Sequence, residues 1–559
     1  MKITIDGHVT SVPEGATIHD AALAAGVVIP TLCHLRGAEA CTSCFVCVVK
    51  VAGREALAPA CATPAADGMV VESGSVAVRD ARRTALELLL SDHAGDCVAP
   101  CQTACPAAMD IPRMLRLVAA DRWAEAAKVV RERIAIPATL GRVCPAPCEQ
   151  ACRRKKLDEP VTICALKAAV ADADAATPRS TGLGRVVVVG AGPAGLSAAW
   201  FLRRRGHGVV VLEAAEAAGG GLRMVEASQH PVDVLAADVA VIQAAGVAFH
   251  FGQAVRTAEG LAVVAAEFDA VLLATGPAAT DAWGLEMTPR GVKVDACHRT
   301  SMARVFAAGA AVGLGGRLAV RAGADALAAV EAIDATLAGR EYAPPPRPWT
   351  CRLHAPRETE LRELARVARG EGVFNRSTGV SPMQTLPEEQ TSTSQQNASE
   401  TVTPCVGHGR DARATHGRDA RATAASRCLH CDCRKAGDAV DPSEWPCALR
   451  RWAAEYGAVA KSGGAAGGGP RREVAVDDTH ELVIYDSGKC ISCGLCVRIA
   501  KLRGEEFGMA FIGRGFSVRV GVPFGRPLRD GLTKCAADIA AACPTGAICL
   551  KREPGLDDR

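Results

Sequence analysis

Residues 184–195 read GRVVVVGAGPAG, an apolar run that leads directly into the glycine pattern G-x-G-x-x-G. The run has the composition of a buried strand, and the glycines permit a tight turn, the close approach of a pyrophosphate and close packing of the next helix. The N-terminus of that helix attracts phosphate charge. A second apolar run, residues 209–212, ends in Glu213, 18 residues after Gly195, where a carboxylate can accept hydrogen bonds from ribose hydroxyls. These features predict a dinucleotide site; the alternative is a glycine-rich turn that binds nothing.

Buried strand-like runs and helix-like runs alternate from residue 184 to residue 342, which is typical of a doubly wound sheet. Within it, GAGPAG, GGGLR at 219–223 and FDAVLLATG at 268–276 resemble the FAD domain of the glutamate synthase small subunit family. The resemblance implies a Rossmann-like FAD domain over residues 179–345. It assigns FAD binding to Gly190, Ala191, Gly192, Pro193, Ala194, Gly195, Glu213, Gly220, Leu222, Arg223, Thr275, Gly276 and Gly309.

That family carries a second dinucleotide domain, for NAD(P)H, between the A-T-G strand and a final V-F-A-G-G-D motif. Here RVFAAG at 304–309 follows Gly276 after only about 30 residues, too few for a nucleotide domain of about 100 residues. Ala310 stands where the family has an aspartate that faces the ribityl chain of the flavin. We therefore predict a truncated flavoprotein that binds FAD more weakly than its relatives and lacks an NAD(P)H domain.

Residues 1–78 predict a small β-grasp ferredoxin domain. An Asp6-Gly7 turn joins two alternating strand-like runs, and Thr17 can cap the helix that follows. Four thiols, spaced x10, x2 and x13, can hold a 2Fe–2S centre: Cys33, Cys44, Cys47 and Cys61. The spacing resembles the ferredoxin domain that opens the large iron–sulfur subunit of respiratory complex I and related hydrogenase subunits. Cys41 is interpreted as a spare thiol, although Cys41, Cys44 and Cys47 also read as C-x2-C-x2-C.

Residues 79–178 predict a helical domain with two 4Fe–4S centres. Its candidate ligands are His93, Cys97, Cys101, Cys105, Cys144, Cys148, Cys152 and Cys164. The stretches at 101–118, 141–152 and 159–167 resemble the cluster domain of the glutamate synthase small subunit and dihydropyrimidine dehydrogenase, and LLLSDHAGDC at 88–97 resembles the His-plus-three-Cys motif of complex I. The cysteine spacing departs from both families.

In the flavoprotein relatives the last ligand is a polar residue just after the V-T-I motif. That position is Lys167 here, and an ammonium cannot ligate iron. We predict one centre from His93, Cys97, Cys101 and Cys152, and the other from Cys105, Cys144, Cys148 and Cys164. An ordinary surface histidine is an equally good interpretation of His93.

Two further cysteine sets lie near the end of the chain. Residues 426–470 contain Cys428, Cys431, Cys433 and Cys447, followed by a glycine-rich linker. C-x2-C-x-C is too tight for disulfides, so this set predicts an iron–sulfur centre, with a four-thiolate zinc site as the alternative. Residues 471–559 predict a 4Fe–4S module held by Cys490, Cys493, Cys496 and Cys543. FIGRGFSVRVG at 511–521 and CPTGA at 543–547 resemble the 4Fe–4S module of complex I's iron–sulfur subunit; Cys297, Cys351, Cys405, Cys535 and Cys549 are interpreted as ordinary thiols.

Residues 346–425 predict a disordered linker, because a Ser/Thr/Gln/Pro-rich stretch offers too little apolar surface to offset ordering. Within it the octapeptide HGRDARAT occurs at 408–415 and again at 416–423. We interpret the repeat as a solvated insert; contact with an anionic partner is the alternative.

The composition bounds the class of protein. The 559 residues carry 64 Lys and Arg against 61 Asp and Glu, which argues against a dedicated nucleic-acid binder. No apolar run reaches the length of a membrane span, and the N-terminus lacks the features of a secretory signal. Twenty-five cysteines in such a chain indicate metal binding rather than disulfides, so we expect a cytoplasmic metalloprotein.

The sequence as a whole predicts a multidomain α/β and α+β oxidoreductase, an electron-transfer subunit that exchanges electrons between FAD and several 2Fe–2S and 4Fe–4S centres. Without a pyridine-nucleotide domain, its expected redox partner is a formate dehydrogenase, hydrogenase or diaphorase subunit. No motif justifies an acid–base catalytic residue. The alternatives are a self-contained NAD(P)H-dependent oxidoreductase and a non-catalytic iron–sulfur scaffold without flavin.

Overall fold

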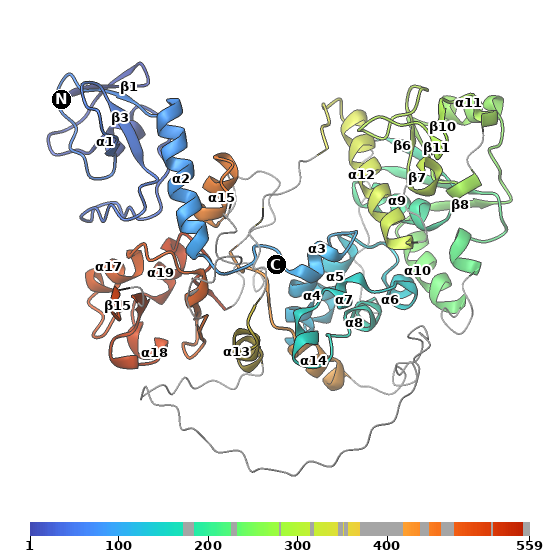
Figure 1. Cartoon of the computed structure of the whole chain (residues 1–559). Coiled ribbons are helices and arrows are strands. Elements are labelled where there is room, and N and C mark those ends of the chain that lie inside the picture. The colour runs from blue at the N-terminus through green and yellow to red at the C-terminus, as the bar shows by residue number, and fades with distance from the viewer. Residues whose placement is uncertain are drawn as a thin grey trace, which may run out of the picture.

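The computed structural model describes residues 1–171, 184–224, 232–278, 281–313, 318–344, 350, 356–368, 418–435, 446–459, 474–515 and 518–551. The N-terminal domain and the C-terminal module lie together, and the helical domain lies beside the domain that contains the glycine turn (Figure 1). Within the described ranges no helix combines the length and apolarity needed to span a bilayer. The first octapeptide copy, Cys351, Cys405 and the glycine-rich linker fall outside these ranges.

The N-terminal domain is the predicted ferredoxin-like fold. Its five-stranded sheet has the order β2-β1-β5-β3-β4, with β1 antiparallel to β2 and parallel to β5. Asp6 and Gly7 have positive φ in the predicted turn, and Thr17 and Asp20 form a reciprocal capping box on the helix. The elements are β1 (Lys2–Ile5), β2 (His8–Ser11), α1 (Ile18–Ala24), β3 (Val48–Val51), β4 (Ala58–Pro59) and β5 (Val70–Glu72).

The helical domain follows α2, which packs against β3 and therefore lies with the N-terminal domain. Short helices that start at proline alternate with cysteine-bearing loops, because proline suits the first helical turn, where no backbone N–H is needed. The elements are α2 (Val76–Asp92), α3 (Pro100–Ala104), α4 (Ile111–Ala119), α5 (Trp123–Arg131), α6 (Pro137–Val143), α7 (Pro147–Gln150), η1 (Arg153–Lys156) and α8 (Ile163–Val170).

The third domain is the predicted Rossmann-like fold, with a fully parallel sheet in the order β12-β9-β6-β7-β8. Between β9 and β12 the described residues form only helical turns and the hairpin β10–β11, so no second nucleotide domain lies there. The elements are β6 (Arg185–Val189), α9 (Pro193–Arg204), β7 (Gly208–Glu213), η2 (Gly220–Met224), α10 (Val232–Ala244), β8 (Ala248–Phe251), α11 (Ala258–Glu267), β9 (Ala270–Leu273), η3 (Gly276–Ala278), η4 (Asp281–Trp283), β10 (Met287–Thr288), β11 (Gly291–Val292), β12 (Val305–Ala307), η5 (Gly309–Val312) and α12 (Ala319–Leu337).

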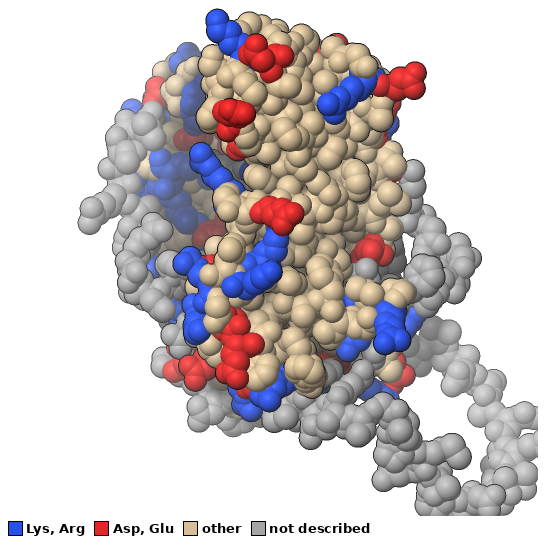
Figure 2. All heavy atoms as spheres, turned by 90° about the vertical axis from the view of Figure 1, so that its left-hand side faces the viewer, with Lys and Arg blue, Asp and Glu red and all other residues tan. Residues whose placement is uncertain are grey.

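The C-terminal module contains a small antiparallel sheet, β13-β14-β17, and a hairpin, β15-β16. Acidic and basic side chains are interspersed on the face of the molecule that carries this module and the N-terminal domain, with broad uncharged areas between them (Figure 2). The elements are β13 (Val476–Asp477), β14 (Val483–Asp486), η8 (Ser487–Lys489), α17 (Leu495–Leu502), β15 (Ala510–Ile512), β16 (Arg519–Gly521), η10 (Pro523–Gly525), α18 (Leu528–Gly531), α19 (Ala536–Ala542) and β17 (Ile548–Leu550).

The prediction of disorder throughout residues 346–425 is wrong where the structure describes this segment. Two helices begin within it, α13 (Glu358–Ala368) and α14 (Arg418–Ser426), and a third, α15 (Ala448–Glu455), follows. The second octapeptide copy forms most of α14, which packs on α4 and buries Ala425 completely. A short alanine-rich helix needs only one apolar face, so the polar composition of the segment did not reveal this helix.

Long-range polar contacts hold the domains together. The buried guanidinium of Arg82 on α2 donates to the carbonyl of Val48 at 2.9 Å and to the hydroxyl of Tyr456 at 2.7 Å. From α17, Arg498 donates to the carbonyl of Cys33 at 2.5 Å. Segments from both ends of the chain therefore meet around the cysteine loops.

Candidate functional site

A cavity of about 750 Å³ lies over the glycine turn, at the carboxyl ends of β6, β7 and β9. Ligand pockets commonly have this size, and doubly wound sheets bind their ligands at this edge. The predicted FAD-binding residues that line the cavity are Gly190, Gly192, Pro193, Ala194, Glu213, Gly220, Leu222, Thr275 and Gly276. We call it the nucleotide cavity.

Two glycines of the turn cannot be replaced without displacing backbone. Gly190 has a φ of +104°, and a Cβ there would lie 2.5 Å from the carbonyl oxygen of Ala274. A Cβ on Gly195 would lie 1.8 Å from the carbonyl oxygen of Gly190. The turn and the first turn of α9 therefore approach at a distance that only glycine allows.

The polar groups around the nucleotide cavity fit a dinucleotide. No side chain caps α9, so its first backbone N–H groups remain available to an anion. The carboxylate of Glu213 accepts from the backbone N–H groups of Ala191 at 2.6 Å and Ala215 at 2.9 Å, which fixes it at the cavity. Oγ1 of Thr275 is buried without a hydrogen-bond partner among the described residues. A bound FAD would supply the missing partner.

Four predicted FAD-binding residues do not line the cavity: Ala191, Gly195, Arg223 and Gly309. Ala191 and Gly195 instead fix the backbone of the turn: the N–H of Ala191 donates to Glu213, and Gly195 packs against the carbonyl of Gly190. Gly309 has a packing role, because its N–H donates to Asp325 at 2.5 Å and a Cβ there would lie 2.8 Å from Cβ of Ala194. Arg223 is exposed and donates to a backbone carbonyl.

The residues that close the cavity were not predicted, because they are apolar or are assigned to another site. Ala310, which replaces the expected aspartate, is at the cavity wall. The missed lining residues include Leu140, Val143, Cys144, Pro145, Trp283, Leu318 and Val320. Cys144 is also a predicted iron ligand, so it connects the nucleotide cavity with a cysteine group.

The cysteines gather into five sulfur groups. Sulfur group 1 is the predicted 2Fe–2S set, Cys33, Cys44, Cys47 and Cys61, all buried. The thiol of Cys47 donates to the sulfur of Cys61 at 3.4 Å, and the thiol of Cys44 lowers the pKa of Cys33 to about 5. Cys41 is exposed, and its interpretation as a spare thiol stays a prediction. Four converging thiols suit a 2Fe–2S centre.

Sulfur group 5 adjoins the nucleotide cavity and comprises Cys105, Cys144, Cys148 and Cys164. All four act on one side chain, Lys167, whose pKa they raise against the opposing effect of burial. Their elements meet because α6 packs on α8 and α7 packs on both α3 and α8. These are the four ligands that we predicted for one 4Fe–4S centre.

Sulfur group 4 comprises Cys101, Cys152, Cys428 and Cys431, which line one small cavity of about 20 Å³. Burial, and then the charges of Cys428, Cys431 and Cys152, raise the pKa of Cys101 well above its usual range. Helix α14, seated on α4, carries Cys428 and Cys431 to the helical domain, and Arg116 fixes the neighbouring Asp432 at 2.7 Å. The donor set suits a 4Fe–4S centre.

Sulfur group 3 comprises Cys97, Cys433 and Cys447. The backbone N–H of Cys433 donates to the carbonyl of Cys97 at 3.3 Å. Burial, followed by the charges of Cys433 and Cys97 among others, raises the pKa of Cys447. A Cβ on Gly546 would lie 2.2 Å from Sγ of Cys433, so a glycine is needed where this thiol packs against the C-terminal module.

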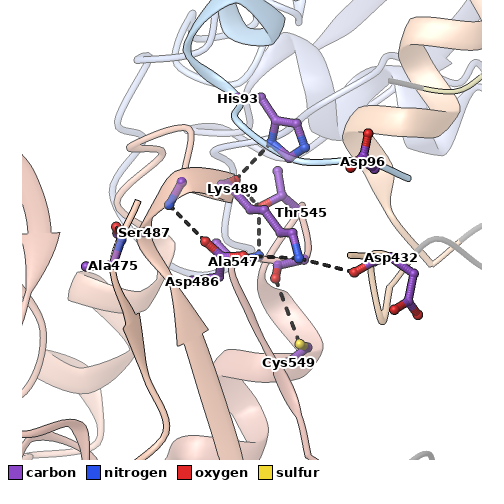
Figure 3. A network of polar contacts seen from close by, with 12 residues as sticks. His93, Asp96, Asp432, Ala475, Asp486, Ser487, Lys489, Thr545, Ala547 and Cys549 are labelled. Carbon is purple, nitrogen blue, oxygen red and sulfur yellow. Dashed lines mark hydrogen bonds and ion pairs between the residues drawn. The ribbon is translucent and has the colours of Figure 1, made fainter. Parts of the chain in front are cut away.

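Beside sulfur group 3, a buried polar network joins the helical and C-terminal segments (Figure 3). Nδ1 of His93 lies 3.1 Å from the carbonyl oxygen of Lys489, which also accepts from Thr545 at 2.9 Å. The ammonium of Lys489 pairs with Asp486 at 3.1 Å. Burial, and then the charge of Lys489, lowers the pKa of His93 to about 4, which keeps the imidazole neutral.

Two predicted groupings are wrong. Cys97 and Cys101 belong to different sulfur groups, because Cys97 precedes α3 whereas Cys101 lies within it. The set Cys428, Cys431, Cys433 and Cys447 is divided between sulfur groups 4 and 3, so it does not form the four-thiolate zinc site considered as its alternative. Across the described ranges, no three His, Cys, Asp or Glu side chains are placed to hold a single metal ion.

Sulfur group 2 is the predicted C-terminal set, Cys490, Cys493, Cys496 and Cys543, around a cavity of about 20 Å³. Of the predicted spare thiols, Cys535 donates to Glu505 at 3.2 Å, away from every group. Cys549 lies close enough to Cys433 and Cys543 for their charges to raise its pKa, after burial, to about 11. It is therefore a neighbour of sulfur groups 2 and 3.

The five groups form one series. After burial, the charge of Cys33 in group 1 contributes to the raised pKa of Cys493 in group 2, and the charge of Cys543 in group 2 contributes to the raised pKa of Cys447 in group 3. Groups 3, 4 and 5 are linked by the run Cys97-x3-Cys101-x3-Cys105, which gives one thiol to each. Cys144 of group 5 lines the nucleotide cavity. The five sulfur groups therefore form a continuous series from the N-terminal domain to the nucleotide cavity.

Gly141 is expected to be essential for sulfur group 5. A Cβ there would lie 2.5 Å from Cβ of Ala168 and 2.7 Å from the carbonyl oxygen of Cys164, so Gly141→Val must separate α6 from α8. We expect the unfolding free energy to fall by about 3 kcal/mol and iron to be lost from this group, measured by denaturant unfolding and iron analysis. Gly74→Ala, where a Cβ meets nothing within 4 Å, should retain both; equal behaviour of the two variants would contradict the prediction.

Comparison with known protein families agrees with this organisation. Residues 1–75 match a 2Fe–2S iron–sulfur cluster binding domain, and residues 83–178 match dihydropyrimidine dehydrogenase domain II, 4Fe–4S cluster. Residues 162–326 match the pyridine nucleotide-disulphide oxidoreductase family, and residues 483–550 match a 4Fe–4S single cluster domain. Each model covers only one part of the chain.

Three relatives illustrate the similarity. The beta subunit of the NADP(+)-dependent formate dehydrogenase of Moorella thermoacetica is 34% identical over 216 residues, 34% of this chain and 31% of that protein. The beta subunit of the NADPH-Fe(3+) oxidoreductase of Geobacter sulfurreducens is 34% identical over 205 residues, 35% of this chain and 30% of that protein. A subunit of the NADP-reducing hydrogenase of Solidesulfovibrio fructosivorans is 58% identical over 104 residues, 18% of each chain.

The matches thus span a third or less of the length of these relatives. They agree on domain type, and four of the five sulfur groups bring four thiols together. The chain therefore has the domain set of an iron–sulfur flavoprotein oxidoreductase, with 2Fe–2S, 4Fe–4S and FAD-type Rossmann domains.

Proposed function

We propose that this chain is an electron-transfer subunit that connects an FAD in the nucleotide cavity to iron–sulfur centres held by the five sulfur groups. The observation that carries the proposal is the unbroken series of groups from Cys144, at the cavity wall, to Cys33, in the N-terminal domain. Bound flavin supplies the exchange between two-electron donors and one-electron carriers.

The ligand roles proposed for the protein are these. Sulfur group 1 holds a 2Fe–2S centre, and sulfur groups 2, 4 and 5 each hold a 4Fe–4S centre with four thiolates. Sulfur group 3 supplies three thiolates, and His93, four residues before Cys97, is the proposed fourth ligand. The surrounding side chains exclude water, and this burial together with backbone N–H donors to the sulfurs, such as that of Arg450 to Cys447, tunes each centre.

The missing second nucleotide domain supports a separate redox partner. Between β9 and β12 the described residues form only helical turns and a hairpin, so this part of the chain contains no second nucleotide domain of the family's kind. The relatives are named as subunits of a formate dehydrogenase, a hydrogenase and an NADPH oxidoreductase. We infer a partner subunit of formate dehydrogenase, hydrogenase or diaphorase type and a cytoplasmic location.

Rapid mixing with reduced nucleotide tests this function. Anaerobically purified protein that contains flavin, iron and acid-labile sulfide should show no prompt flavin bleaching on mixing with NADH or NADPH alone, because no nucleotide domain presents the hydride. Dithionite should bleach the flavin and all the iron–sulfur centres, as the control. Prompt bleaching by either nucleotide would favour a self-contained oxidoreductase, and purified protein without flavin would favour a scaffold.

A further inference from the structure

Lys167 is a buried cation without a carboxylate partner. It lies on α8, one turn after Cys164, and is only 3% exposed. Its ammonium donates to Sγ of Cys164 at 3.8 Å, and in the described part of the chain no carboxylate lies within ion-pair distance of it. Lys489, the buried lysine of the network in Figure 3, differs because Asp486 neutralises it at 3.1 Å.

The charges that act on Lys167 come from one source. The thiols of Cys164, Cys144, Cys148 and Cys105 surround this ammonium, because α6 and α7 pack on α8 and α3 packs on α7. These thiols are the whole of sulfur group 5. A buried ammonium is tolerated only when an opposite charge compensates the loss of hydration. The compensating charge here must be the sulfur group itself.

We propose that Lys167 is the counter-ion of the iron–sulfur centre in sulfur group 5 and raises the reduction potential of that centre above the value it would otherwise have. The inference rests on the proposed function, which places a centre in this group. Reduction adds one electron and so one negative charge, which a fixed positive charge at hydrogen-bond distance stabilises. Because Cys144 lines the nucleotide cavity, the residue favours the arrival of an electron on the centre nearest the flavin.

Three substitutions separate the charge from the hydrogen bond and from packing. Lys167→Met removes both charge and donor, Lys167→Gln keeps a donor without charge, and Lys167→Arg keeps the charge. Lys128→Met, on the exposed side of α5, is the matched control for net charge. The readout is the midpoint potential of each centre in an EPR-monitored redox titration of the full chain. The signal of sulfur group 5 is the one that disappears in Cys148→Ser protein.

The neutral variants should lower the reduction equilibrium constant of this centre about tenfold, a shift of about 59 mV to more negative potential. Lys167→Arg and Lys128→Met should leave it near the wild-type value, and the other centres should not move. A neutral variant that keeps its iron and the wild-type potential would overturn the inference, as would an equal shift in Lys128→Met. If Lys167→Met protein loses its iron, the midpoint potential of the Lys167→Gln protein decides whether the charge of Lys167 raises the potential of the centre. Absence of any group 5 signal in wild-type protein would instead contradict the proposed function.

Discussion

Cys428→Ser is expected to remove one four-iron centre and to disconnect the N-terminal centre from the proposed flavin. Cys428 is buried in sulfur group 4, between the group beside the nucleotide cavity and the groups that lead to Cys33. A serine hydroxyl is a poor ligand for the cluster, so we expect about four iron atoms per chain to be lost. Iron and sulfide analysis measures the loss, and EPR after photoreduction of the bound flavin should show the N-terminal centre still oxidised.

The division of thiols among the sulfur groups predicts which cysteine variants lose the same centre. Cys101→Ser should give the same loss as Cys428→Ser, and the double variant should lose no more than either, because both thiols belong to one group. Cys433→Ser should instead remove the centre of sulfur group 3. Cys535→Ser, whose thiol bonds to Glu505, is the control and should keep all its iron. Additive losses from Cys101→Ser and Cys428→Ser would show that the two thiols serve different centres.

Gly195→Ala is expected to abolish flavin binding while the iron–sulfur domains remain loaded. The new Cβ would lie 1.8 Å from the carbonyl oxygen of Gly190, so α9 must move away from the turn that would hold the pyrophosphate. We expect a loss of about 3 kcal/mol or more in the unfolding free energy of this domain, as for other overpacked cores. Flavin fluorescence after denaturation, compared with iron content, measures the effect.

Gly208→Ala provides the matched control for this variant. Gly208 begins β7 in the same domain, has no positive φ, and a Cβ there would meet its nearest neighbour at 3.7 Å. Its flavin content should equal that of wild-type protein. Full flavin occupancy in Gly195→Ala protein would mean that the cofactor binds elsewhere than over the turn.

Sequence patterns predicted the features whose residues lie close together in the chain. GRVVVVGAGPAG contains the strand β6, the glycine turn and the start of α9. The C-terminal C-x2-C-x2-C run supplies three of the four thiols of sulfur group 2. In these two cases local backbone geometry fixes which side chains meet. Sulfur group 5 was also proposed from the sequence, as one half of a division of eight candidate ligands, but its thiols lie in segments from residue 105 to residue 164 and meet only through helix packing.

The division of the remaining thiols could not be predicted from spacing. Cys97 and Cys105 lie outside α3 while Cys101 lies inside it, so three evenly spaced thiols point to three different groups. Cys428 and Cys431 meet Cys101 only because α14 seats on α4, a contact between segments far apart in the sequence. Nor does any local pattern reveal that Lys167 has no carboxylate near it, since that depends on every element packed around α8.

The division of Cys97, Cys101 and Cys105 among three groups constrains how the protein matures. Sulfur groups 1 and 5 draw all their thiols from residues 33–164, which leave the ribosome early, and can receive metal before synthesis ends. Sulfur groups 3 and 4 need Cys428, Cys431, Cys433 and Cys447 as well, so they stay incomplete until the last quarter of the chain has emerged. Cofactor insertion into sulfur groups 3 and 4 is therefore expected to follow insertion into groups 1 and 5, and sulfur group 2, which needs Cys543, is expected to be completed last.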